Sequence, residues 1–141
     1  MHFFLSFLSV QSKHTHTQQW NDRDLNVPWI VEFEELIEKY NKDYNRYQRQ
    51  CDTFGPVLTE GNYFTLTETI NVSHEMPVNS FEKLLAQSKT FSYVRNVIDR
   101  RDESDSLSWS HWEEDLREIV HRHHGSKPFA IPYVTRLYLL R

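Results

Sequence analysis

Glycine is scarce in this chain, and its scarcity removes one class of binding site. Only three glycines, Gly55, Gly61 and Gly125, occur among 141 residues, whereas average usage would give about ten. None of them lies in a cluster of the kind that cradles a phosphate or pyrophosphate at the start of a helix. The sequence therefore contains no Gly-rich nucleotide-binding turn.

Cysteine and long apolar runs are also missing. Cys51 is the only cysteine, so no intramolecular disulfide can form. A lone cysteine is usually a small buried hydrophobic residue, and the lack of disulfides fits a reducing compartment. No stretch reaches the roughly 20 apolar residues that a membrane span needs. We therefore expect a cytoplasmic protein that does not associate with membranes.

The chain has no excess of basic residues. It carries 16 Lys and Arg against 20 Asp and Glu, a formal charge of −4. Proteins that bind nucleic acid usually show a basic stripe, so we expect no nucleic-acid partner. Aromatic residues, in contrast, make up 14% of the chain, which argues against intrinsic disorder. The length allows one domain at most.

The first 25 residues differ from the rest. Met1–Val10 imitates the apolar core of a signal peptide, but it lacks a basic start, and no small-x-small cleavage site follows. Gln11–Gln19 is polar and patternless. Secretion and an incomplete or mis-spliced gene product are both open explanations. We expect residues 1–25 to lie outside the fold and residues 26–141 to form it.

A long amphipathic helix is predicted from Pro28. Asn26 and Pro28 form a helix start, and apolar residues then recur every three or four positions over about 20 residues. The far half of this helix carries a stripe of phenols, Tyr40, Tyr44 and Tyr47. The front half is expected in the core, whereas the phenol stripe fits either the core or the wall or lid of a cleft.

Alternating residues predict a half-buried strand over 63–73. Its apolar face would carry Phe64, Leu66, Ile70 and Val72. Glu68 falls on that face, which indicates either an edge of the sheet or a paired carboxylate. Residues 133–140 predict a final strand that is apolar on both faces, which is typical of the interior of a sheet covered by helices.

Helices are predicted between these two strands. Ser80 caps the first, Ser110 and Glu113 form a capping box for the last, and Gly125 would end it. Helices and strands together predict an α/β fold, which is α+β for the chain as it stands.

The sequence assigns no catalytic residue and no metal ligand. His121, His123 and His124 follow one another closely, but 121 and 124 share a helix face that 123 does not, and cations are favoured at a helix C-terminus. A helix terminus therefore explains them better than a zinc site. Ser88 lies at a helix bend where a hydroxyl could face a ligand, but no G-x-S-x-G motif makes it a nucleophile.

Three stretches carry a resemblance to a known family. Pro28–Gln48 is similar to the aromatic-rich helical insertion that follows the fifth strand of class I S-adenosylmethionine-dependent methyltransferases. Phe81–Val94 resembles a helix that reads like "WLRTWSAY" in the trans-aconitate methyltransferase-like group, with the Trp of that phrase near Ser88. Trp109–Arg141 resembles the last helix and closing strand. The resemblance covers residues 26–141.

The resemblance implies a fold and a function. The fold would be part of a Rossmann-like methyltransferase domain, with strands 63–73 and 133–140 as the last two, antiparallel strands of its sheet. Tyr40, Tyr44, Tyr47 and Ser88 would help to cover a small-molecule substrate. The full-length relatives use S-adenosylmethionine, which they bind through a Gly-rich turn and an acidic residue. This sequence has neither, so we expect it to bind no cofactor and to be inactive alone.

A non-enzymatic alternative also fits the sequence. An α+β interaction module could use the aromatic face around Tyr40–Tyr47 to dock a partner. The sequence names neither the substrate nor the oligomeric state.

Overall fold

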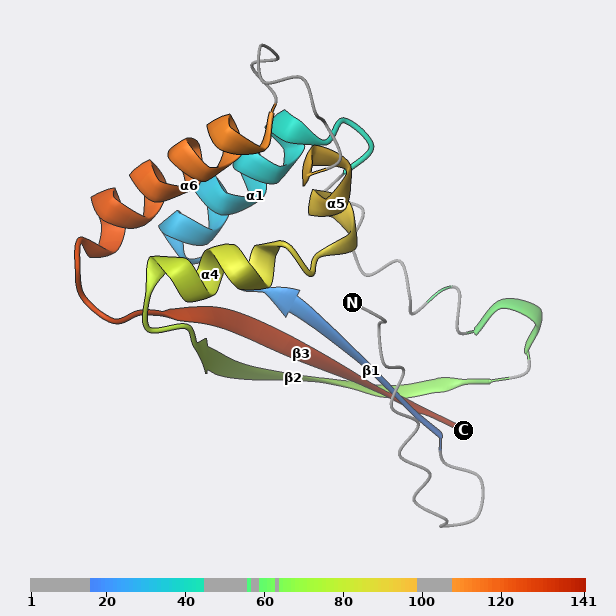
Figure 1. The fold of residues 1–141 in the computed structure, drawn as a ribbon. Helices are drawn as coiled ribbons and strands as arrows, with labels where there is room; N and C mark the ends of the chain where they lie inside the picture. The colour runs from blue at the N-terminus through green and yellow to red at the C-terminus, as the bar shows by residue number, and fades with distance from the viewer. Residues whose placement is uncertain (1–15, 45–55, 57–58, 63, 99–107) are drawn as a thin grey trace. The chain divides into compact units, whose positions relative to one another are not determined.

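The computed structural model describes residues 16–44, 56, 59–62, 64–98 and 108–141 (Figure 1). In chain order the elements are β1 (His16–Arg23), α1 (Pro28–Tyr40), η1 (Glu60–Asn62), β2 (Leu66–Pro77), α4 (Phe81–Ser88), α5 (Ser92–Ile98), α6 (Trp109–His124) and β3 (Ala130–Leu140). The mixture of helices and strands confirms the α+β class.

The chain divides into two compact units. The first, the helical unit, includes α1, α4, α5 and α6. The second, the sheet unit, includes β1 and most of β2 and β3. Each unit is described below by itself.

Aromatic packing between α1 and α6 forms the centre of the helical unit. The apolar face of α1 buries Trp29, Ile30, Phe33, Leu36, Ile37 and Tyr40, and that of α6 buries Trp112, Leu116, Ile119 and Val120. The Trp112 ring meets Tyr40 edge to face at 5.5 Å and Phe33 at 6.3 Å between ring centroids. Edge-to-face geometry is favourable for aromatic pairs. The apolar faces that repeat every 3.6 residues along both helices therefore pack together as one shared core.

Helix α1 is shorter than the sequence predicts. It ends at Tyr40 because Asn41 adopts an extended backbone. The Asn41 side chain holds this turn, since its Nδ2 donates to the Tyr93 carbonyl at 2.7 Å and its Oδ1 accepts from the Asp43 N–H at 3.0 Å. Asparagine commonly ends helices in this way. The predicted continuation of the helix is therefore wrong for residues 41–44, and the residues from 45 to 55 lie outside the described part of the chain.

The ends of α4 and α6 test three capping predictions. Ser80 caps α4, accepting from the Lys83 N–H at 3.3 Å, as predicted. Gly125 follows α6 with a φ of 60°, which also confirms the prediction. The capping box at Ser110 is wrong, because α6 begins at Trp109 and Ser108 is its N-cap residue. Ser108 Oγ instead contacts His111 Nδ1 at 2.8 Å.

The described strands form one sheet in the order β1-β3-β2 (Figure 1). Strand β1 pairs antiparallel with β3, from His16 opposite Leu140 to Arg23 opposite Tyr133. On the other side of β3, Thr65 and Arg141 exchange backbone hydrogen bonds of 2.8 and 2.9 Å, and the Val78 N–H reaches the Phe129 carbonyl. Strand β3 is therefore antiparallel to both neighbours, and β1 and β2 run in the same direction.

This topology corrects one prediction and confirms another. The expectation that residues 1–25 lie outside the fold is wrong for His16–Arg23, because this polar segment gains a full set of cross-strand partners on β3. The two-sided apolar pattern of residues 133–140 correctly places that strand inside the sheet. A polar sequence can still form a strand, because backbone groups make the ladder.

Strand β2 lies at an edge of the described sheet and is more exposed than predicted. It runs from Leu66 to Pro77 rather than over 63–73. Ile70 and Val72 remain 37% and 46% exposed, and Phe64, just before the strand, 36%. The predicted half-burial is therefore wrong for these residues. Glu68 is exposed as well, which supports the edge interpretation of that residue.

Candidate functional site

Three of the four predicted substrate-covering residues lie in the interior of the helical unit. Tyr40 and Ser88 are fully buried, and Tyr44 is 8% exposed. Tyr47 lies outside the described residues. The structure thus assigns Tyr40 to the core together with the front half of the helix, and it adds Tyr44 to that core.

The hydroxyl groups of Tyr40, Tyr44 and Ser88 all donate hydrogen bonds to other groups of the protein. Tyr40 donates to Asp115 Oδ2 at 2.8 Å, and Tyr44 donates to Glu34 Oε2. Ser88 Oγ donates to the Leu84 carbonyl at 2.8 Å, one turn earlier in α4. Contact between these side chains and a substrate stays a prediction, and it would require the present hydrogen bonds to be exchanged.

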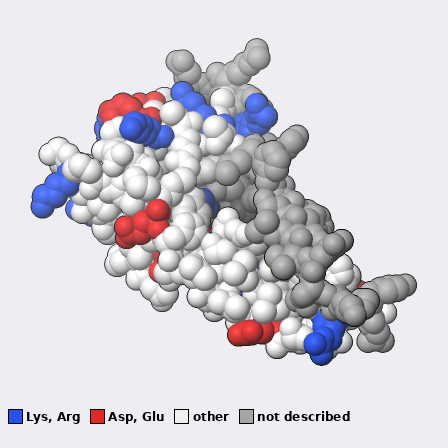
Figure 2. Space-filling model, turned by 90° about the horizontal axis from the view of Figure 1, so that it is seen from below, with Lys and Arg blue, Asp and Glu red and all other residues white. Residues whose placement is uncertain are grey.

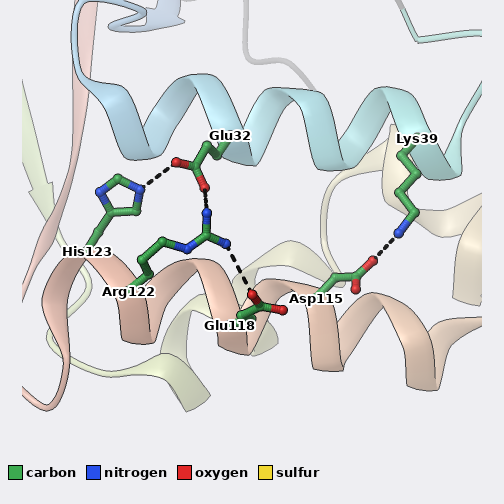
Figure 3. Close-up of polar contacts among 6 residues, drawn as sticks. All are labelled: Glu32, Lys39, Asp115, Glu118, Arg122 and His123. Carbon is green, nitrogen blue, oxygen red and sulfur yellow. Dashed lines mark hydrogen bonds and ion pairs between the residues drawn. The ribbon is translucent and has the colours of Figure 1, made fainter.

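A charged groove runs between α1 and α6, as Figure 3 shows for six of the residues in and beside it. Its volume is about 250 Å³. The lining residues are Glu32, Glu35, Leu36, Lys39, Asp115, Glu118, Ile119 and Arg122. None of the four predicted substrate-covering residues is among them.

Asp115 joins the two helices at one end of this groove. Lys39 Nζ lies 2.6 Å from Asp115 Oδ2, the oxygen that also accepts from Tyr40. Burial opposes ionisation of Asp115, but the hydrogen bonds from Lys39 and Tyr40 outweigh it and lower the pKa of the carboxyl. Burial first, and then the hydrogen bond to Asp115, raises the pKa of Tyr40. Asp115 is therefore a carboxylate and Tyr40 a neutral phenol at neutral pH.

Glu32 joins the helices at the other end. Its two carboxylate oxygens lie 2.8 Å from His123 Nε2 and 3.0 Å from Arg122 Nη1. Arg122 also reaches Glu118, the residue one turn earlier in α6, at 3.5 Å (Figure 3). Glu32 of α1 therefore contacts two neighbouring residues of α6, and Arg122 is shared between Glu32 and Glu118.

The histidines at the end of α6 contact different neighbours. His123 bonds to Glu32, whereas His124 is stacked on Phe129 with ring centroids 4.6 Å apart and meets Trp29 at 5.2 Å. Among the residues that the structure describes, no three potential metal ligands come together. Burial, reinforced by the charge of His123, lowers the pKa of His124.

The sheet unit carries a second polar group of side chains, which we call the sheet triad: Asn21 on β1, Thr135 on β3 and His74 on β2. Thr135 lies directly opposite Asn21 and donates from Oγ1 to Asn21 Oδ1 at 2.6 Å. The same Oγ1 lies 3.3 Å from His74 Nδ1. The His74 ring also stacks on Tyr133, with centroids 5.6 Å apart and planes 17° apart.

Sequence reasoning missed the sheet triad. Thr135 and Arg136 are the two polar residues in a strand that is otherwise apolar on both faces, and Thr135 was therefore the available signal. It could not identify Asn21, which was expected outside the fold, or His74, which was expected beyond the end of its strand. The long-range register of the sheet brings the three residues together.

A further polar contact in the sheet unit involves Trp20, Asp22 and Arg136. Trp20 Nε1 donates to Asp22 Oδ1 at 3.0 Å, and Arg136 Nη2 lies 3.5 Å from Asp22 Oδ2. Asp22 is only 9% exposed, so its charge needs these partners.

On the face that Figure 2 shows, the described acidic and basic residues form small separate groups. No helix in the described part of the chain is both long and apolar enough to cross a membrane. Searches of protein-family models, curated proteins and solved structures find no match to this chain.

Proposed function

We propose that this chain forms the C-terminal, substrate-covering part of an S-adenosylmethionine-dependent methyltransferase that acts on a small molecule. The proposal rests on the family resemblance of residues 26–141. The single structural observation that supports it is the strand order β1-β3-β2 with β3 antiparallel to both neighbours.

The strand order supports the proposal. In such a domain the closing strand is antiparallel and is inserted next to parallel strands. Strand β3 lies between β1 and β2, which run in the same direction as each other and antiparallel to it. On this proposal β1 corresponds to the fifth strand of the family, because α1, at Pro28–Tyr40, is the helix that would follow it.

The residues present do not fit the cofactor itself. Among the described glycines, Gly61 lies in η1 and Gly125 at the C-terminal end of α6, so neither opens a helix towards a phosphate or carboxylate. A Cβ added at Gly125 would meet nothing within 4 Å, so no close backbone approach requires that glycine. S-adenosylmethionine would therefore have to be held by a separate cofactor-binding half.

Complementation tests this proposal. The 141-residue chain would be co-expressed with the cofactor-binding half of a trans-aconitate methyltransferase that has been truncated before its fifth strand. We expect the two polypeptides to copurify, and we expect S-adenosylmethionine to raise the unfolding midpoint of the complex, since a ligand that binds only the native state stabilises it. Copurification without this rise, or no copurification, would contradict the proposal.

Two controls accompany the complementation. The truncated half alone should show no rise with the cofactor. The 141-residue chain alone should also show none, and a clear rise would refute the inference that cofactor binding requires the other half.

One observation favours the non-enzymatic alternative. The exposed side chains of Phe64, Ile70 and Val72 lie on or beside an edge strand, and edge strands readily pair with a further chain. The docking surface would then be β2 and not the phenol stripe, because Tyr40 and Tyr44 are buried. Binding of a protein partner that Val72→Lys abolishes, without complementation of the cofactor-binding half, would favour this alternative.

A further inference from the structure

We propose that His74 is a binding residue whose Nε2 accepts a hydrogen bond from the hydroxyl group of a small, planar ligand such as a phenol. The other two members of the sheet triad, Thr135 and Asn21, position it. The inference rests on the proposed function in one respect, which is that the ligand would be the methyl acceptor. The site itself is argued from contacts within the sheet unit.

The hydrogen bonds of the triad fix which ring nitrogen carries the proton. A threonine hydroxyl has one hydrogen to donate, and Thr135 donates it to Asn21 Oδ1 at 2.6 Å. Its oxygen therefore has only lone pairs to offer His74 Nδ1, which lies 3.3 Å away. In the neutral imidazole, Nδ1 must then carry the proton and Nε2 the lone pair.

The lone pair on Nε2 is available to a ligand. His74 is exposed, and within the described part of the chain the only polar partner of its ring is Thr135 at Nδ1. Stacking on Tyr133 at 5.6 Å supports the ring from one side. The imidazole is thus held in place by a hydrogen bond and a ring contact, while its accepting nitrogen has no partner among the described residues.

Two members of the triad lie near the same end of the sheet. Asn21 lies near the carboxyl end of β1 (His16–Arg23) and His74 near that of β2 (Leu66–Pro77). These two strands run in the same direction on either side of β3.

The chemistry of Nε2 selects the ligand class. A lone pair attracts a hydrogen-bond donor and repels a carboxylate; among neutral donors, a hydroxyl group is also one to which a methyl group can be transferred. A planar ring would extend the stack that His74 already forms with Tyr133. The inferred acceptor is therefore a hydroxyl compound, whereas the family resemblance by itself implies only a small molecule.

The tautomer of His74 is the first test. Long-range ¹H–¹⁵N spectra of the full chain, recorded on neutral imidazole, should show the Nδ1–H tautomer for His74. Thr135→Val keeps the shape of the side chain but removes its hydroxyl. In this variant the preference should fall towards the mixture of the two neutral tautomers that a free imidazole shows. An Nε2–H tautomer in the unmutated chain would overturn the proposal, as would an unchanged tautomer in Thr135→Val.

Ligand titration is the second test, with phenol as the probe and anisole as its matched control. Phenol should shift the Nε2 resonance of His74 in a saturable manner, and anisole, which has no hydroxyl, should bind at least tenfold more weakly. His74→Phe keeps an aromatic ring and should abolish the difference between the two compounds. Equal responses to phenol and anisole in the unmutated chain would overturn the proposal.

These outcomes separate the site from the proposed function. If the complementation succeeds but His74 shows the Nε2–H tautomer, the methyltransferase proposal stands and the role of His74 is refuted. The Nδ1–H tautomer and phenol selectivity without complementation would establish the hydroxyl site and refute its assignment to a methyl acceptor.

Discussion

The Tyr40 hydroxyl donates a 2.8 Å hydrogen bond to Asp115 Oδ2, an oxygen that also lies 2.6 Å from Lys39 Nζ. One carboxylate of α6 thus holds two consecutive residues at the end of α1. The Tyr40 ring, on its other side, packs against Trp112. The last turn of α1 is therefore fixed by a polar and an aromatic contact at once, which explains why a phenol rather than a phenylalanine is useful at position 40.

Replacing Asp115 by Asn should destabilise the helical unit by about 1–3 kcal/mol, because hydrogen bonds to a charged group are lost and the Tyr40 hydroxyl is left with a weaker acceptor. Urea unfolding followed by tryptophan fluorescence measures the loss. Glu114→Gln is the matched control, since it removes an exposed carboxylate from the neighbouring position and should cost less than about 0.5 kcal/mol. Equal losses in the two variants would contradict the prediction.

The same contact predicts how acid affects stability. The pKa of Asp115 is lower in the folded chain than its ordinary value of 3.8, so the unfolded chain binds the proton first. The stabilisation is fully present above that ordinary value and is lost as pH falls through it towards the folded pKa. The difference in unfolding free energy between the unmutated chain and Asp115→Asn should therefore shrink below about pH 4. A difference that stays constant from pH 6 to pH 3 would refute this assignment.

His124 should make the protein less stable in mild acid. Its ring lies against Trp29 and Phe129, and its buried Nε2 has no hydrogen-bond partner among the described residues. Because burial lowers its pKa below the ordinary 6.5, the unfolded chain takes up the proton first, and stability falls as pH drops below that value.

His124→Phe isolates this effect, since phenylalanine keeps the aromatic stack and cannot be protonated. Thermal unfolding between pH 8 and pH 5 should show a smaller decrease in midpoint for this variant. His121→Phe, at an exposed position of the same helix, is the control and should behave like the unmutated chain. A decrease of unchanged size in His124→Phe would show that other groups cause the acid sensitivity.

The sequence predicts the helical unit better than the sheet. Helix faces repeat every 3.6 residues, so Phe33, Leu36, Ile37 and Leu116 could be identified as core from spacing alone, and the structure buries all four. The end of α1 was missed because it depends on the side-chain bonds of Asn41, which no periodicity reveals. Local signals were sufficient at Ser80 and Gly125, where the capping residue itself determines the end.

The sheet depends on long-range pairing that a single sequence does not display. The segment His16–Arg23 has almost no apolar residues to mark it as a strand, yet it pairs with β3 over its whole length. The alternation in β2 correctly predicts a strand but not its burial, because burial depends on what covers the strand. The sheet triad combines both problems, since its three residues come from three strands far apart in the sequence.

The exposed apolar residues of β2 should promote self-association. In the described part of the chain β2 is an edge strand, and between its exposed carboxylates Glu68 and Glu75 it presents the apolar side chains of Ile70 and Val72, where pairing with another chain is least opposed. Val72→Lys places a charge at a position that is 46% exposed, so it should raise the concentration at which the protein associates and leave the unfolding midpoint nearly unchanged. Light scattering across a dilution series measures this, with Ser73→Lys as a control for added charge alone. Indistinguishable scattering in the unmutated chain and Val72→Lys would exclude β2 as the contact.

Removal of β1 should disrupt the sheet unit. Two truncated chains can be compared, one beginning at residue 16 and one at residue 24, so that their difference reports β1 alone. The shorter chain loses the backbone hydrogen bonds from His16–Arg23 to β3, and it also loses the acceptor of the Thr135 hydroxyl. Unpaired backbone groups on a central strand are costly.

We therefore expect the chain beginning at residue 24 to lose cooperative unfolding or to aggregate, whereas the chain beginning at residue 16 retains both the transition and the Nδ1–H tautomer of His74. Circular dichroism and the imidazole spectrum measure these two properties. If both chains melt alike, β1 adds nothing to stability, and its pairing with β3 cannot support a match to the fifth strand of a methyltransferase. If only the tautomer changes, β1 is a replaceable strand whose contribution is to hold Thr135 and, through it, His74.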